Sequence, residues 1–465
     1  MKNASLIVLS MLTFISLNYA QTKDSADPDT NRTPASTEEK ITTLKGEVDG
    51  LNESYAETKS TVAALSKIKV SGYIQAQYLV NDVMNVLSLN GVKSPYVRQA
   101  FMIKRGRLKT TYDAGLCQYV LEIDVTQDGV GMKDAYASFK EPWMKALSLT
   151  VGSMDRPFGY EVSYSSSMLE SPERSKMIGY LFPKEKDLGA MLEFAQEEGP
   201  LSFLNVKAGV YNGMTNILNE DNDYKDIIGR IGFKAPFQEI GLDIDGGVSG
   251  YKGLMTDVDT TTGGRAYSMD ASNHQWDLTT GQKGKTFDRQ YFGADLQLFY
   301  ATPVIGGTCV KGEYVQGKHP TKAGADDFYS ITVAPPTSDA LFNREIMGYY
   351  AYFIQNIDPA NLQLVVKYDF WDPNTKISAT DFTNANTSLT AGAALTAGDI
   401  AYSTLGLGLL YYLPWAQNIR CMLFYEIPKN EKLTNVTNGT LAKYANNNTS
   451  ATNLNLLTAR VQVKF

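Results

Sequence analysis

The chain has 465 residues, of which 43% are hydrophobic, 20% charged and 11% aromatic, and tyrosine (28) outnumbers phenylalanine (19). A formal charge of −7 with no basic face argues against a nucleic-acid partner. Beyond residue 20 there is no run of about 18 apolar residues, so the sequence excludes a transmembrane helix. The length is normal for a large barrel, and the tyrosine excess is typical of chains with rings at a membrane interface.

The first segment, residues 1–20, has the pattern of a secretory signal peptide. Lys2 precedes an apolar stretch from Leu6 to Leu17, and a small residue, Ala20, precedes the expected cut. The alternative is a buried N-terminal helix. Residues 21–36 are polar and contain proline, which predicts a flexible linker.

Residues 37–67 carry a heptad pattern. The a positions are Ile41, Val48, Tyr55 and Val62, and the d positions are Leu44, Leu51, Thr58 and Leu65. Four heptads predict a helix of about 40 Å that forms a coiled coil, and β-branched a residues with leucine at d favour a dimer. An amphipathic helix packed on its own domain is the alternative.

From residue 68 to residue 465 the hydrophobic pattern has period two. In "CQYVLEIDV", from Cys117 to Val125, apolar and polar residues alternate, and "NLQLVVKYDF", from Asn361 to Phe370, does the same. About sixteen such segments of roughly ten residues follow one another, and this is the length that a tilted strand needs to cross a bilayer. The sequence therefore predicts an all-β transmembrane antiparallel barrel of about 16 strands, preceded by a short α-helical coiled coil.

Short turns alternate with long polar loops along this region. The predicted turns are 113–115, 141–143, 199–200, 236–238, 303–305, 359–360 and 414–416, and the predicted loops are 155–186, 213–225, 251–288, 318–345, 372–400 and 428–454. Outer-membrane barrels have short periplasmic turns and long extracellular loops, whereas a soluble sandwich has no reason to place every long loop at one end. An even strand count also brings both ends of the barrel to the periplasm.

The final strand, "LLTARVQVKF", alternates as far as Phe465. An exposed last strand is an aggregation hazard unless it is paired, so we expect it to close the barrel against "KVSGYIQAQYLV" near the start. Its apolar face then meets lipid, and its polar face lines the lumen.

A barrel of this size encloses water, so inward residues should be polar. Inward cations are expected at Lys207, Arg230, Lys234, Lys311, Lys367, Arg460 and Lys464, and inward carboxylates at Glu122, Asp124, Asp134, Glu193, Asp295, Glu313 and Asp369. A lipid-facing lysine or arginine near the bilayer centre costs roughly 2–4 kcal/mol. Arg105 and Arg107 share parity with the apolar Phe101 and Ile103, which would turn both arginines toward lipid. Either a bulge or a periplasmic position beyond the apolar band would keep them out of the lipid.

The first long loop, residues 155–186, follows the fifth predicted strand and is expected to fold inward. Its cations, Arg156, Arg174, Lys176, Lys184 and Lys186, could serve an anion as donors in the pore. Six carboxylates, of which Asp187 lies just beyond the loop, oppose them, so a solvated surface loop with internal ion pairs is the alternative.

Several motifs together resemble the phosphate-selective porin family of O and P type: "RGRLKTTYDAG", "KDAYASFKEP", "LTVGSMDRPFGYE", "ESPERS" and "LFPKEKDLGA". The resemblance runs from about Val70 to Phe465 and is densest between residues 98 and 195. It implies a sixteen-stranded homotrimer in a Gram-negative outer membrane, with the third loop constricting each pore and a coiled coil in the periplasm. The phosphate specificity of the family depends on an arginine ladder, which inward carboxylates interrupt in this chain.

The predicted function is a porin for passive diffusion of small hydrophilic solutes, either unselective or preferring anions such as phosphate. The predicted pore-lining residues are Arg105, Arg107, Arg156, Arg174, Lys176, Lys207, Arg230, Lys311, Lys367 and Arg460. The expected partners are outer-membrane lipid, small solutes and the cell wall, the last through the coiled coil. A structural anchor with a plugged barrel is the alternative.

No enzymatic activity, cofactor or metal is expected. His274 and His319 lie in predicted loops without a catalytic motif. Cys117, Cys309 and Cys421 lie on different predicted strands, and we expect none of them to form a structural disulfide.

Overall fold

The computed structural model describes residues 37–81, 97–213, 222–270, 272–322, 339–389, 394–439, 441–445 and 455–465. The chain divides into two compact units, Met1–Ser66 and Lys67–Phe465. The predicted signal peptide and linker lie outside the described residues, and both remain predictions.

The first unit contains one helix, α2 (Thr37–Leu65). Its length confirms that the heptad segment is helical, and the a and d side chains lie exposed along it, from Ile41 to Leu65. A partner for this stripe, and with it the coiled coil, remains a prediction. Among the described residues, no helix combines the length and the apolar character that a membrane span requires.

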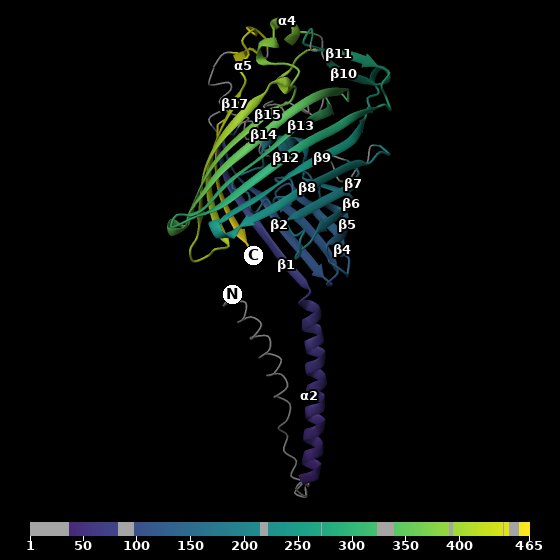
Figure 1. Cartoon of the computed structure of the whole chain (residues 1–465), viewed down its shortest axis with the longest axis vertical. Helices are drawn as coiled ribbons and strands as arrows, with labels where there is room; N and C mark the ends of the chain where they lie inside the picture. Colours follow the sequence, from purple (N-terminus) through teal and green to yellow (C-terminus); the bar gives the residue numbers. More distant parts are fainter. Residues whose placement is uncertain are drawn as a thin grey trace, which may run out of the picture. The chain divides into compact units, whose positions relative to one another are not determined.

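The second unit is built almost wholly of strands (Figure 1). The first nine are β1 (Ile68–Asn81), β2 (Gln99–Asp113), β3 (Cys117–Thr126), β4 (Gly129–Lys140), β5 (Leu147–Asp155), β6 (Lys186–Ala195), β7 (Leu204–Tyr211), β8 (Asp226–Phe237) and β9 (Leu242–Thr256). The others are β10 (Arg265–Asp270), β11 (Gln275–Thr280), β12 (Thr286–Thr302), β13 (Gly306–Lys322), β14 (Leu341–Ile357), β15 (Leu362–Asp372), β16 (Tyr402–Tyr412), β17 (Ile419–Asn430) and β18 (Leu456–Lys464).

These strands form a closed antiparallel barrel. Each pairs with the next along the chain, except that β9 pairs with β12 because β10 and β11 form a hairpin outside the wall. The last strand, β18, pairs with β1, with Tyr73 opposite Lys464. Leaving out the hairpin, sixteen of the 18 strands make up the wall, which confirms both the predicted fold and its closure.

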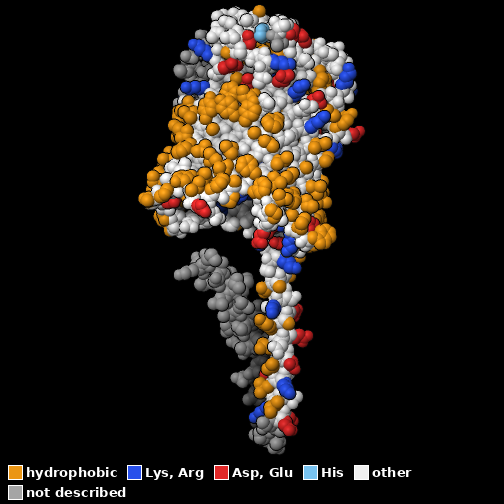
Figure 2. All heavy atoms as spheres, in the orientation of Figure 1, with side chains coloured by type: hydrophobic (Ala, Val, Ile, Leu, Met, Phe, Trp, Pro, Cys, Tyr) orange, Lys and Arg blue, Asp and Glu red, His pale blue; other side chains and the backbone are white. Residues whose placement is uncertain are grey.

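Side chains alternate across the wall as the period-two pattern predicts. Leu121 and Val125 on β3 face outward and are exposed, whereas Glu122 faces inward and is buried. Figure 2 shows the result on one face, where hydrophobic side chains form a broad band around the barrel. Such a band is what a β-barrel presents to lipid.

All seven predicted turns join strands at one end of the barrel, which we call the turn end. The opposite, loop end carries all six predicted long loops, and the connection 82–98 also belongs there. One connection at the loop end is short, because only Gln127 and Asp128 join β3 to β4. The sequence pattern places the long loops correctly, but not every loop at that end is long.

Several loops at the loop end pack into a small domain with its own core, visible at the top of Figure 1. It contains the β10–β11 hairpin and the short helices α4 (Asn384–Thr387) and α5 (Ala442–Ala445), and β10 pairs in parallel with the start of β14. Trp276, Phe342 and Phe382 are buried at its centre. The sequence predicts only long polar loops for these segments, so this packed domain is a feature that the pattern does not reveal.

Candidate pore constriction

The connection between β5 and β6, residues 156–185, lies inside the barrel. Its Ser166 carbonyl accepts a hydrogen bond from Gln75 on β1 (3.1 Å), and its Glu170 pairs with Lys311 on β13 (2.7 Å). The loop therefore contacts walls that lie on different sides of the lumen. Gly159 has a φ of +59°, a left-handed conformation that favours glycine, and a Cβ there would lie 1.7 Å from Glu313 Oε1 on β13, so any other residue would displace the Glu313 side chain.

An apolar cluster attaches the loop to the inner wall. Phe158 and Phe182 are fully buried with their ring centroids 4.9 Å apart, and both rings contact Tyr291 on β12. The short helix α3 (Lys176–Leu181) adds Met177 and Ile178, both buried. Burial of each such side chain contributes about 1.5–3 kcal/mol, which is enough to hold the loop in place.

Polar contacts with β13 and β14 hold the loop against the same part of the inner wall as the apolar cluster. The Lys311 ammonium lies 4.2 Å from the ring centroid of Tyr164 and 5.0 Å from that of Tyr352, in addition to its ion pair with Glu170. Glu313 accepts hydrogen bonds from the backbone N–H groups of Tyr160 and Glu161, both at 3.2 Å. Lys311 therefore anchors the loop, and its charge is already engaged.

A β-bulge determines on which side of the wall the Arg105 and Arg107 side chains lie. In the pairing of β1 with β2, Gln75 lies opposite Arg105 and Ala76 lies opposite Ile103, so Lys104 is an extra residue. The bulge shifts the alternation by one position, which buries both arginines in the lumen and leaves Phe101 exposed on the outside. Of the two alternatives that the sequence leaves open, the structure has the bulge.

Glu173, in the loop, is the centre of one ion-pair cluster. Its carboxylate lies 2.7 Å from Arg105, 3.1 Å from Arg460 and 3.6 Å from Lys104. Burial acts to raise the pKa of Glu173, but the three cations outweigh it and hold the pKa well below its usual range. This carboxylate is therefore ionised at neutral pH and neutralises cations on β2 and β18.

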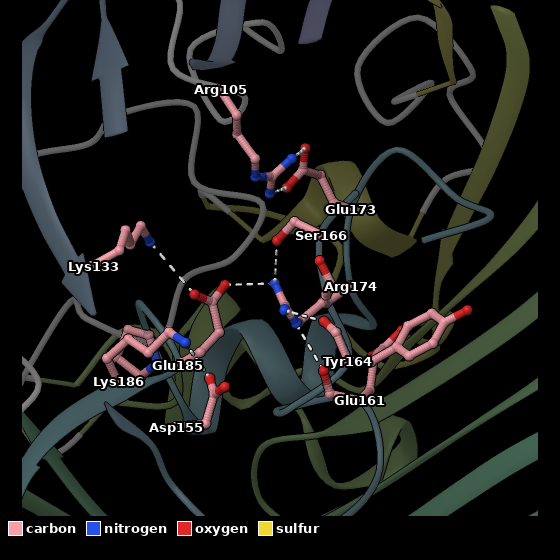
Figure 3. A network of polar contacts seen from close by, with 12 residues as sticks. Arg105, Lys133, Asp155, Glu161, Tyr164, Ser166, Glu173, Arg174, Glu185 and Lys186 are labelled. Atoms are coloured by element: carbon pink, nitrogen blue, oxygen red, sulfur yellow. Dashed lines mark hydrogen bonds and ion pairs between the residues drawn. The ribbon is translucent and has the colours of Figure 1, made fainter. Parts of the chain in front are cut away.

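Glu185, at the end of the loop, is the centre of a second cluster (Figure 3). It accepts a hydrogen bond from Arg174 at 2.6 Å and pairs with Lys133 on β4 at 3.4 Å. Arg174 also donates to the carbonyls of Glu161 and Tyr164. Burial acts to raise the pKa of Glu185, but Arg174 and Lys133 lower it to about 2.

The other predicted pore residues are also engaged. Arg107 pairs with Glu122 (2.9 Å) and Asp124 (3.4 Å), Lys207 with Glu193 (3.3 Å), Arg230 with Asp295 (2.6 Å), and Lys367 with Asp369 (3.5 Å). Arg156 donates to the carbonyls of Pro183 and Glu185, and the backbone N–H of Lys176 donates to Asp369. Eight of the ten predicted cations therefore pair with a carboxylate, whereas Arg156 is bound by carbonyls and Lys176 contributes its backbone N–H.

Lys104 and Lys133 are not among the pore residues that the sequence pattern predicts. Both are extra residues in bulges: Lys104 lies between Ile103 and Arg105 on β2, and Lys133 lies between Met132 and Asp134 on β4. The pattern also does not identify Glu173 and Glu185 as the partners of the arginines. A polar residue that interrupts an apolar face, as Lys104 and Lys133 do, was the available signal for a bulge.

His319 is placed differently from the prediction. The sequence pattern predicts a loop at His319, but β13 continues to Lys322, and the His319 ring lies against Tyr180 and Tyr291. Its Nδ1 is 2.5 Å from the Tyr291 hydroxyl. Within the described ranges, no three His, Cys, Asp or Glu side chains form a group that could hold a metal ion.

No family model matches the chain, and no curated protein matches it. Solved structures do resemble it. OprB of Pseudomonas putida aligns with a TM-score of 0.53 at 9% identity, covering 87% of this chain and 96% of that one. OmpT of Vibrio cholerae, described as an outer membrane protein in trimer form, has a TM-score of 0.48 at 11% identity, covering 86% and 99%. The outer membrane channel DcaP of Acinetobacter baumannii has a TM-score of 0.46 at 10% identity, covering 86% and 97%. At these identities, the likeness to OprB shows that the two chains share the barrel fold.

Proposed function

We propose that this chain is an outer-membrane porin through which small hydrophilic solutes diffuse passively. The observation that carries the proposal is a closed sixteen-stranded wall, apolar outside and polar inside, with one long loop folded into its lumen. A barrel of this size encloses a water-filled channel unless its interior is filled. The turn end then faces the periplasm and the loop end faces the outside.

The pairing of charges supports weak ion selectivity. The loop, residues 156–185, carries four cations and four carboxylates, and two of these carboxylates, Glu173 and Glu185, pair with cations of the wall. A strongly anion-selective pore requires a ring of cations without carboxylate partners. We therefore place general diffusion ahead of phosphate selectivity, which only the sequence resemblance favours.

The oligomeric state of the protein is part of the same proposal. Helix α2 leaves a heptad stripe exposed over its whole length, and a parallel bundle of three such helices would bury it. We propose a homotrimer whose helices associate in the periplasm, where they could also contact the cell wall. The proposal rests on the exposed stripe of α2 and not on the trimeric OmpT structure, whose similarity to this chain is low.

A structural anchor with a plugged barrel is the second candidate. One observation favours it: the loop bonds to β1, β2 and β18 on one side of the lumen and to β13–β15 on the other. Contacts on both sides narrow the passage that remains.

Liposome swelling distinguishes the two candidates. Vesicles that contain the purified protein are diluted into isotonic solutions of neutral sugars of increasing size. A porin admits small sugars and excludes larger ones, so the swelling rate should fall with sugar size. The absence of swelling with every sugar, from protein that shows the heat-modifiable mobility of a folded barrel, would favour the anchor.

A further inference from the structure

A groove among the described residues lies on the outside of the wall. It has a volume of about 920 Å³ and crosses β8, β9, β12, β13 and β14 near the loop end. The side chains that border it include Lys252, Gln290, Phe292, Lys318 and Met347. Lys252, Phe292 and Lys318 are among its exposed, outward-facing members.

The upper edge of the groove is a polar row set by strand register. Lys252 lies opposite Gln290, and Gln290 lies opposite Lys318, so two lysines flank one amide on neighbouring strands. Among the side chains that the structure describes, neither ammonium lies within 4.0 Å of a carboxylate. Lysines at this level can extend toward the headgroups while their stems cover apolar surface.

The nearby acids lie outside the lysine pair. Glu345, opposite Lys318 in the register, pairs with Lys376 at 3.3 Å. Asp288 lies one row nearer the loop end, opposite Leu254, and Asp372 lies one row nearer the turn end, opposite Met347. The positive charge is therefore confined to the row of Lys252, Gln290 and Lys318.

Below the polar row the wall is hollow and mainly apolar, with Gln316 between Phe292 and Met347 in the register. Gly229 and Gly250 lie opposite each other, and a Cβ built on Gly250 meets no atom within 4 Å. Beside them lie Phe292 and Met347. A second groove of about 390 Å³ on the same strands, nearer the turn end, is bordered by outward-facing residues that are mainly small or apolar, among them Ala294 and Leu298.

We infer that this groove binds a phosphorylated, acylated lipid of the outer leaflet. The phosphate would bind between Lys252 and Lys318, and an acyl chain would lie over Gly250 toward the second groove. Basic side chains above an apolar slot are the arrangement that recognises an anionic lipid headgroup. The inference assigns a lipid site on the outer face, separate from the lumen and its solutes.

The test is native mass spectrometry of the full-length protein, released from a neutral detergent after titration with bis-phosphorylated lipid A. The variant K252Q/K318Q removes both charges, and K429Q/K432Q is the matched control, since Lys429 and Lys432 are exposed near the loop end on and just after β17. We expect about tenfold weaker binding for the groove variant and no change for the control. Equal weakening in both variants would overturn the inference.

A second variant tests the apolar part. Gly250→Leu fills the hollow without removing charge, and open space at Gly250 allows it to fold. We expect it to weaken lipid A binding as well, whereas free inorganic phosphate should not displace the lipid. If the groove variants bind lipid A normally but lose their oligomeric state, the groove is a contact between subunits and the inference is wrong.

Discussion

At the scale of single residues, the lumen is organised by carboxylates that the loop brings to cations on the wall. Glu173 joins β2 to β18, and Glu185 joins the loop to β4. Breaking a buried pair by removing one partner costs about 3–5 kcal/mol, because the other charge is left without compensation. The same residues therefore set both the position of the loop and the charge that a solute meets.

The low pKa of Glu185 predicts a pH dependence of stability. Its pKa is lowered from 4.5 to about 2 in the folded protein, so its stabilising contribution is complete above about pH 4.5 and is lost as pH falls toward 2. We expect wild type to have a higher Tm than Glu185→Gln at pH 7, and the difference to shrink below pH 4. A difference that stays constant from pH 7 to pH 3 would contradict this account.

The bulge at Lys104 gives a second prediction. Deleting Lys104 removes the extra residue, so Ile103 stays outside opposite Ala76 and Arg105 stays in the lumen opposite Gln75. We therefore expect this deletion to assemble into vesicles as wild type does, measured by heat-modifiable mobility. Deleting Gly106 instead makes Arg105 and Arg107 neighbours and turns one of them to lipid at a cost of roughly 2–4 kcal/mol, so assembly should fall sharply. Equal assembly of the two deletions would contradict this account.

The limits of sequence reasoning are clearest at this residue scale. Alternation alone places Glu122, Lys311 and Arg460 in the lumen, because apolar and polar residues exchange at every position. It fails at Lys104 and Lys133, where one extra residue changes the parity. It also cannot pair Arg105 with Glu173, since the contact depends on how the loop folds across 68 residues of sequence separation.

At the scale of elements, the loop between β5 and β6 is held by its apolar side, so its attachment can be weakened without changing charge. Phe182→Ala removes a fully buried ring from the cluster with Phe158 and Tyr291, a loss of about 3–5 kcal/mol. We expect a larger or noisier single-channel conductance. Phe353→Ala on the lipid-facing wall is the control, and an equal change in both variants would argue against attachment by the cluster.

Helix α2 gives the prediction for the second unit. Deleting residues 37–67 should leave a barrel that folds and conducts, because the barrel closes through β1 and β18 without the helix. If the helices associate, the deletion should also weaken the trimer, measured as a shift to monomer in neutral detergent. Recovery of only unfolded protein would show that the helix is needed for assembly of the barrel.

At the scale of the whole molecule, strand number, closure and the positions of turns and loops follow from the period-two pattern and the proline-containing turns. The packed domain at the loop end does not, because its core joins residues from several loops, such as Trp276 and Phe382, that no local pattern connects. The groove on the outer wall likewise arises from the register of five strands. Sequence periodicity determines the wall, and long-range packing determines what covers and narrows it.

The most direct measurement is the single-channel current of the purified protein in a planar bilayer under a KCl gradient. The account predicts discrete openings with a reversal potential close to zero and no block by added phosphate, because eight of the ten predicted pore cations are already paired with carboxylates. A strongly anion-selective reversal potential with phosphate block would contradict it by revealing a cationic filter. Folded protein that never opens would contradict the proposed diffusion channel itself.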